Sequence, residues 1–117
     1  FAPHYYDIAL LQMKRHRPWV TIDAQLEAPV VGTRRTIVGV HKKLIALLRD
    51  RASTIGKSGV PTLLGETGVA MDIGGIAGRA LQEGDFAMAT LALDNIMSAV
   101  EQAFVSVTMW NYAAGNT

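Results

Sequence analysis

A short apolar stretch at residues 59–68 constrains the fold of this chain more than any other feature. It enters through a glycine and a proline and contains β-branched residues without helical spacing, so it predicts a buried strand of the kind found in parallel sheets. Glu66 stands at the carboxyl end of this strand, between Gly65 and Gly68, whose small size leaves the carboxylate open. In parallel α/β architectures ligands meet these strand ends. Glu66 is therefore a candidate reactive carboxylate, beside the plainer interpretation of an acidic residue in a solvated loop.

Two amphipathic helices and two further strands surround this stretch. Apolar residues recur at helical spacing from about Thr33 or Arg34 to Ala52 and again from Asp85, the expected N-cap, to about Ala103. Residues 1–6 and 104–112 have the alternating or β-rich composition of strands. The order predicts an α/β fold with three neighbouring parallel strands, two main helices and right-handed crossovers.

The connections between these elements carry weaker signals. Residues 8–32 lack a sustained period, and we interpret them as an elaborated loop with room for a helical turn, in which an apolar run precedes a basic run and Trp19. Such a loop, over residues 8–22, is a candidate for contact with an anionic membrane surface. The glycine-rich residues after Gly68 match neither a phosphate loop nor a dinucleotide-binding fingerprint, which favours a flexible connection.

Composition excludes several other classes of protein. The 117 residues suffice for one domain, the formal net charge is +1 and there is no cysteine. Ten of the eleven Lys and Arg residues lie in residues 1–57, but they are dispersed and no nucleic-acid motif accompanies them, so we expect no nucleic-acid partner. His4, His16 and His41 lack the spacing of metal ligands, and we expect neither a metal nor a cofactor.

Because the chain starts inside a strand at Phe1, we expect it to be a fragment of a longer protein.

Four side chains are predicted to meet at the carboxyl edge of the sheet. His4 and Tyr6 project from the same face of the first strand, Glu66 ends the second and Trp110 ends the third. A carboxylate beside a phenol and an imidazole, with an indole nearby, suits glycosidic chemistry. The carboxylate attacks the anomeric carbon and the indole presents a flat apolar face to the sugar.

These residues resemble the last three strands of a glycoside hydrolase of family five, in the branch of endoglycoceramidases and steryl or ceramide β-glucosidases. The motifs that carry the resemblance, which covers essentially the whole chain, are Phe1-Ala2-Pro3-His4-Tyr5-Tyr6-Asp7, Gly65-Glu66-Thr67-Gly68-Val69-Ala70-Met71-Asp72, Gly84-Asp85-Phe86 and Thr108-Met109-Trp110-Asn111-Tyr112. The resemblance implies that residues 1–117 are strands six to eight, the C-terminal portion of a (β/α)8 TIM barrel that retains configuration. It also implies that Glu66 is the nucleophile and that His4 and Tyr6 support it. The implied substrate-binding residues are Trp19, Asp72, Trp110 and Asn111.

Two departures from the family pattern bear on activity. Ala70 stands where relatives often have proline. The family's acid/base glutamate, which follows an asparagine at the end of strand four, lies outside this chain, and Asp7 and Asp72 do not match its role. We therefore expect the isolated chain to be inactive. Its open strand edges would pair with the missing N-terminal part of the barrel or with another copy.

The leading hypothesis is thus a retaining β-glycosidase. Its substrate is expected to be a β-glycoside of a glycolipid, such as glucosylceramide or a steryl glucoside, because the loop at residues 8–22 combines apolar and basic groups. The alternative is a non-catalytic carbohydrate- or lipid-binding module, or a self-associating structural module.

Overall fold

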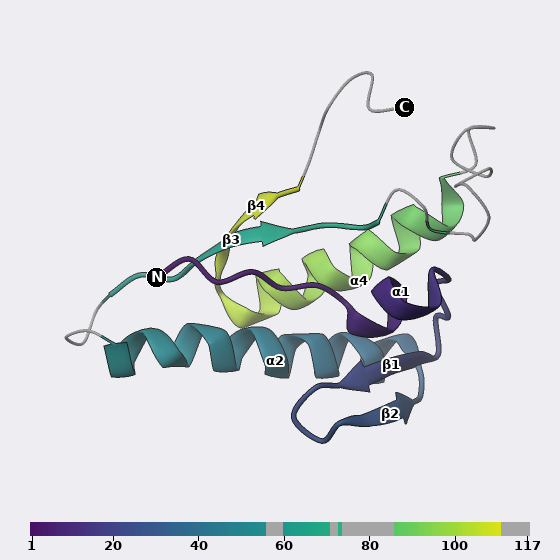
Figure 1. Cartoon of the computed structure of the whole chain (residues 1–117), viewed down its shortest axis with the longest axis horizontal. Helices are drawn as coiled ribbons and strands as arrows, with labels where there is room; N and C mark the ends of the chain where they lie inside the picture. The colour runs from purple at the N-terminus through teal and green to yellow at the C-terminus, as the bar shows by residue number, and fades with distance from the viewer. Residues whose placement is uncertain (56–59, 71–72, 74–85, 111–117) are drawn as a thin grey trace.

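The computed structural model describes residues 1–55, 60–70, 73 and 86–110, and it has an α/β architecture (Figure 1). Its elements in chain order are α1 (Ile8–Met13), β1 (Val20–Asp23), β2 (Ala28–Val31), α2 (Arg34–Ile55), β3 (Leu63–Thr67), α4 (Ala87–Ala103) and β4 (Ser106–Met109). The predicted α/β class and the two main helices are therefore confirmed, whereas the assignment to a TIM barrel stays a prediction. None of the described helices combines the length and apolar character needed to cross a bilayer.

Three segments run in parallel through the centre of the molecule. β4 pairs with β3 on one side, and the N-terminal segment lies along the other side (Figure 1). That segment is joined to β3 by alternating backbone hydrogen bonds, from the Leu63 amide to the Phe1 carbonyl at 3.0 Å and from the Gly65 amide to the Pro3 carbonyl at 2.8 Å. The parallel arrangement agrees with the prediction, although residues 1–6 form an isolated bridge at His4 and Glu66 instead of a complete strand.

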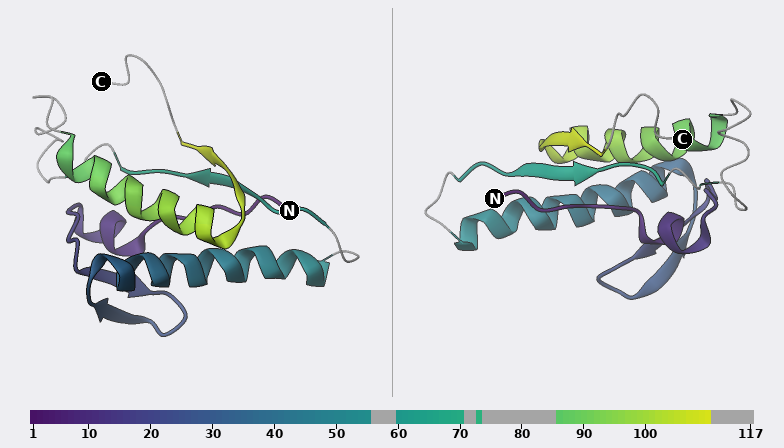
Figure 2. Two further views of the ribbon diagram at one scale, coloured as in Figure 1. Left: turned by 180° about the vertical axis from the view of Figure 1, so that it is seen from behind. Right: turned by 45° about the horizontal axis from the view of Figure 1, so that its top comes forward.

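The core lies between this parallel layer and the two long helices, α2 and α4, which run beside each other (Figure 2). Tyr5 and Leu64 enter it from the layer. The helices contribute Val38, Val40, Leu44, Ile45, Ile96, Ala99, Val100 and Ala103. Arg49 of α2 also donates a hydrogen bond of 2.7 Å to the Ala103 carbonyl, which satisfies one of the free acceptors at the end of α4. The helical period in the sequence predicted these buried faces because each helix must cover the same layer.

Residues 8–32 are more ordered than a loop: the helical turn that the interpretation allowed is present as α1, whereas the hairpin that follows it was not predicted. Asp7 starts α1, because its Oδ1 accepts hydrogen bonds from the amides of Ala9 at 2.9 Å and Leu10 at 3.3 Å. β1 and β2 then form an antiparallel hairpin in which Val20 pairs with Val31. The strands have only four residues each, too few for the alternation to be recognised in the sequence.

The end of α2 and the start of α4 differ from the predicted helix boundaries. α2 begins at Arg34, as predicted, and continues to Ile55, three residues beyond the predicted end. α4 begins at Ala87, and its N-cap is Phe86, which makes no side-chain capping bond. The predicted N-cap, Asp85, is therefore wrong, and it lies outside the described residues.

Candidate active site

The carboxylate of Glu66 and the phenol of Tyr6 are in direct contact. The Tyr6 hydroxyl donates a hydrogen bond of 2.5 Å to Glu66 Oε1, and His4 Nδ1 lies 3.8 Å from the same oxygen. The side chain of Glu66 is 24% exposed and that of His4 is 60% exposed, so both are open to solvent. Three of the four predicted site residues therefore meet, as the period of two in the first segment indicated.

An irregularity in β3 accounts for the direction of the Glu66 side chain. Leu64 pairs with Val107 and Thr67 pairs with Met109. Between these two pairs β3 therefore contains one residue more than β4. One extra residue in a strand re-aims the side chains around it. Leu64 and Thr67 are both fully buried, whereas Glu66, two residues after Leu64, reaches His4 and Tyr6 on the open face. In a regular strand Glu66 would share the buried face of Leu64.

The protonation state of Tyr6 suits its contact with a carboxylate. Removal from solvent raises the pKa of Tyr6, and the hydrogen bond and negative charge of Glu66 raise it further, to about 12. Tyr6 therefore stays protonated near neutral pH and donates its hydroxyl proton to the ionised carboxylate. This hydrogen bond holds Glu66 Oε1 in place. Because the carboxylate is rigid and planar, the position of Oε2 is restricted as well.

Trp110 lies at the same end of the parallel layer. Its amide donates a hydrogen bond of 2.7 Å to the Thr67 carbonyl, and the residue is 60% exposed. A Cβ on Gly68 would lie only 2.2 Å from the Trp110 carbonyl oxygen. Gly68 thus permits the ends of β3 and β4 to approach closely. From the sequence we had expected its small size to leave the Glu66 carboxylate open instead.

Trp19, another predicted site residue, lies away from Glu66. Trp19 immediately precedes β1, is 55% exposed, and its carbonyl accepts a hydrogen bond of 2.9 Å from the Gly32 amide. The β1–β2 hairpin packs on α1 and α2 and lies across the molecule from β4 (Figures 1 and 2). Asp72 and Asn111 lie outside the described residues. The roles of these three residues in substrate binding stay predictions.

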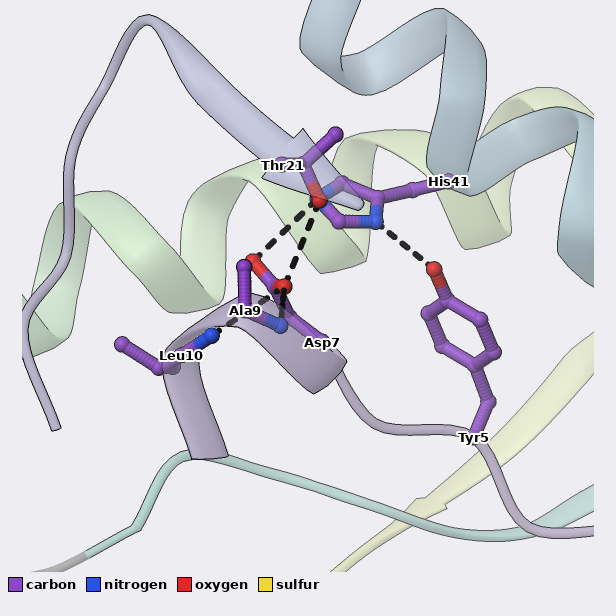
Figure 3. Close-up of polar contacts among 6 residues, drawn as sticks. All are labelled: Tyr5, Asp7, Ala9, Leu10, Thr21 and His41. Atoms are coloured by element: carbon purple, nitrogen blue, oxygen red, sulfur yellow. Dashed lines mark hydrogen bonds and ion pairs between the residues drawn. The ribbon is translucent and has the colours of Figure 1, made fainter. Parts of the chain in front are cut away.

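A buried polar network, which was not predicted from the sequence, lies beneath the site (Figure 3). The Tyr5 hydroxyl lies 2.7 Å from His41 Nδ1, and His41 Nε2 lies 3.6 Å from Asp7 Oδ2. Thr21 donates its hydroxyl proton to Asp7 Oδ1 over 3.3 Å. The spacing of His41, four residues after Ile37 and within the apolar stripe of α2, could have indicated a buried histidine.

The charges in this network are controlled by burial. Burial lowers the pKa of His41, the carboxylate of Asp7 opposes that effect, and nearby His16 adds to it. Burial likewise raises the pKa of Tyr5. Both side chains are therefore neutral near pH 7. Across the part of the chain that the structure describes, no group of three or more His, Asp or Glu side chains is arranged to hold a metal ion.

The fold and the site define an α/β segment with a phenol-bound carboxylate at the end of a parallel strand. No family model matches the chain. It is 29% identical to a glucosylceramidase of Cryptococcus neoformans and 25% identical to one of Rhizopus delemar. It is also 28% identical to an ergosteryl-β-glucosidase of Saccharomyces cerevisiae.

These similarities cover nearly all of this chain but little of the relatives. Each alignment includes 99% of the chain, which spans only 16–18% of the length of the three curated relatives. The names of all three are those of glucoside-cleaving hydrolases, so the similarity indicates a relationship to glycoside hydrolases. Assignment to family five stays a prediction.

Proposed function

We propose that this chain is part of a retaining β-glycosidase of family five, in which Glu66 is the nucleophile. In this proposal residues 1–117 correspond to strands six to eight of a (β/α)8 barrel, and the substrate is a glycolipid such as glucosylceramide or a steryl glucoside. The observation that carries the proposal is the hydrogen bond of 2.5 Å between Tyr6 and Glu66 Oε1 at the carboxyl end of β3. The similarity to proteins named as glucosylceramidases supports the choice of substrate.

The proposed reaction has two displacement steps at the anomeric carbon. Tyr6 holds Glu66 Oε1, so we assign Oε2 as the attacking atom. A bond forms between Oε2 and C1 while the bond from C1 to the aglycone oxygen breaks, and the aglycone leaves with the electron pair and takes up a proton. Water then attacks C1 and releases Glu66. The proton donor and base is a second carboxylate, roughly 5 to 5.5 Å from Glu66, which another part of the full protein supplies.

The remaining site residues have supporting roles in this proposal. His4, with Nδ1 3.8 Å from Glu66 Oε1, adds a second polar group beside the nucleophile. Trp110 presents its exposed indole at the same end of the parallel layer, where a sugar ring can stack on it. Because the second carboxylate lies elsewhere, we expect the isolated chain to be inactive.

A matched pair of glutamate variants tests the role of Glu66. In the full protein that carries this chain, Glu66→Gln removes the nucleophile and is expected to lower turnover of an aryl β-glucoside roughly a thousandfold or more. Glu101→Gln makes the same change at an exposed position on α4 and should leave turnover unchanged. Wild-type turnover by Glu66→Gln would refute the proposal. Binding of glucosides without hydrolysis by the wild-type protein would instead favour a carbohydrate-binding module.

We further propose that the region from residue 8 to the β1–β2 hairpin contacts the lipid part of the substrate or the membrane surface that contains it. The outer face of the hairpin carries four apolar residues in two cross-strand pairs, Val20 with Val31 and Ile22 with Pro29. Val31 is 70% exposed, and the exposed Arg17 stands just before Trp19. Apolar side chains beside basic ones are the combination that binds anionic lipid surfaces.

A comparison of a substrate in vesicles with a water-soluble substrate separates this lipid contact from the chemistry at Glu66. Trp19→Ala should lower hydrolysis of glucosylceramide in anionic vesicles but leave hydrolysis of a water-soluble aryl glucoside unchanged. Phe104→Ala, which removes another exposed aromatic residue next to β4, is the control and should affect neither. Equal activity of Trp19→Ala and wild type on vesicles would contradict the lipid contact.

The open edges of the parallel layer are the proposed junctions with the rest of the barrel. Within the described residues, the N-terminal segment and β4 each pair with β3 and present their other edge unpaired. Unpaired edges invite strand addition. We expect the isolated chain to self-associate through these edges, and a monomeric elution by light scattering would contradict this.

A further inference from the structure

We infer that Tyr5, His41 and Asp7 form a positioning network that holds Tyr6 against Glu66. This inference rests on the proposed glycosidase function, because it assigns the network a part in the activity of that site. The three side chains are buried and joined to one another (Figure 3), and none of the side-chain hydrogen bonds or ion pairs described for them reaches Glu66. Their influence must therefore pass through the backbone of the segment that carries His4 and Tyr6.

The sequence places Tyr6 between two anchored neighbours. Tyr5 is 9% exposed and Asp7 is 7% exposed, whereas Tyr6 lies on the open face with its hydroxyl on Glu66. Successive side chains of an extended segment point to opposite faces, so the anchors hold the segment from the side opposite the site. Fixing both neighbours restricts the backbone of Tyr6 and thereby the position of its hydroxyl.

Tyr5 is anchored through its side chain and through its backbone. Its hydroxyl lies 2.7 Å from His41 Nδ1, and the two rings meet edge to face with centroids 5.9 Å apart. Its amide donates a hydrogen bond of 3.0 Å to the Glu66 carbonyl, and its carbonyl accepts one of 2.7 Å from the Thr67 hydroxyl. Tyr5 thus connects α2 directly to the backbone of the proposed nucleophile.

Asp7 completes the network from the other side of Tyr6. Its Oδ1 accepts hydrogen bonds from the Ala9 and Leu10 amides and from the Thr21 hydroxyl, and its Oδ2 lies 3.6 Å from His41 Nε2. Because the buried imidazole is neutral, it carries one proton, which the carboxylate favours at Nε2. Nδ1 is then free to accept the hydroxyl proton of Tyr5.

Loss of the Tyr5 hydroxyl would leave His41 Nδ1 buried without a donor and would loosen the segment. A displacement of about 1 Å at a reacting group can lower a rate about a hundredfold. We therefore expect Tyr5→Phe, which preserves the ring, to slow the chemical step while substrate binding stays unchanged. A purely structural role would instead lower stability without separating the chemical step from binding.

The experiment uses the full protein and an activated 2-deoxy-2-fluoroglucoside, which reacts at the nucleophile and forms a stable glycosyl-enzyme. Tyr5→Phe should reduce the maximal rate of labelling about 10- to 100-fold with an unchanged inhibitor dissociation constant. His41→Gln, whose amide oxygen can accept from Tyr5, should retain more of this rate than His41→Leu. Thr62→Val is the control, because it removes a hydroxyl that bonds the Arg49 carbonyl at 3.3 Å, outside the network. This variant should label at the wild-type rate.

A second readout does not depend on activity. In Tyr5→Phe the hydrogen bond from Tyr6 to Glu66 should weaken, so NMR titration should show the pKa of Tyr6 falling from about 12 toward 10. Wild-type labelling by Tyr5→Phe, or an unchanged Tyr6 titration, would overturn the inference while the proposed function stands. Absence of any label on the wild-type protein would instead refute the proposed function. If Tyr5→Phe does not fold, equal labelling rates in His41→Gln and His41→Leu would overturn the inference.

Discussion

Replacing Gly68 with alanine tests how closely the ends of β3 and β4 approach each other. The new Cβ would lie 2.2 Å from the Trp110 carbonyl oxygen and 3.3 Å from its carbonyl carbon, whereas ordinary contacts begin at 3.4 Å. The Trp110 carbonyl oxygen would therefore have to move away by about 1.2 Å, from 2.2 Å to the ordinary contact distance of 3.4 Å. The retreat would also stretch the hydrogen bond of 2.7 Å from the Trp110 amide to the Thr67 carbonyl.

The change in the free energy of unfolding combines two destabilising contributions and one stabilising contribution. Overpacking costs about 1 to 3 kcal/mol, and a weakened backbone hydrogen bond costs up to about 1 kcal/mol more. Alanine offsets about 0.4 to 1 kcal/mol of this by restricting the unfolded chain. The middle of each range gives a fall in the free energy of unfolding of about 2 kcal/mol. If the indole of Trp110 supports the sugar, the KM for an aryl glucoside should also rise.

Gly39 provides a matched control for the same substitution. It is exposed within α2, and a Cβ there would have no atom within 4 Å apart from its chain neighbours and the adjacent helix backbone. Gly39→Ala should raise the free energy of unfolding by about 0.8 to 1 kcal/mol, since alanine favours the helix. Urea denaturation of both variants in the full protein measures the two effects. If Gly68→Ala were as stable as wild type or stabilised like Gly39→Ala, the close approach of the strand ends would be refuted.

Two further predictions concern pH. Burial lowers the pKa of His41 and of His16, so the unfolded state takes up protons first as the pH falls through about 6.5. The free energy of unfolding should thus fall between pH 7.5 and 5.5, and denaturation midpoints independent of pH in this range would contradict it. The pKa of Asp23 lies below its usual value, chiefly because Lys43 Nζ donates a hydrogen bond of 2.9 Å to its carboxylate. This lowered pKa stabilises the folded state, and the stabilisation is lost as the pH falls below about 3.9. Lys43→Met should raise the pKa of Asp23 and flatten this acid dependence; an unchanged carboxyl titration by NMR would argue against the pairing.

Local patterns in the sequence predicted the main elements of the fold. The apolar stripe of α2 repeats often enough over its 22 residues to specify both the helix and its buried face. The alternation of strands and helices likewise predicted parallel neighbours, and with them the meeting of His4 and Tyr6 with Glu66. These features depend on spacings within one segment and on the rule that parallel strands share an edge.

Features that depend on contacts between distant segments were not predicted. The bond between Tyr5 and His41 joins residues 36 positions apart, and no local spacing relates them. The irregularity that turns Glu66 to the open face arises from the register between β3 and β4, which the composition of β3 alone does not encode. The capping role of Asp7 was not predicted, because it appears only when α1, a helix of six residues, is recognised.

The most direct test of the central claim is to identify the residue that a mechanism-based inhibitor labels. The full protein would be incubated with an activated 2-deoxy-2-fluoroglucoside, and its intact mass and peptides would then be measured. We predict a gain of one fluoroglucosyl group, attached to Glu66 in the peptide that contains β3. An unlabelled protein, or a label on another carboxylate, would contradict the assignment of Glu66 as the nucleophile.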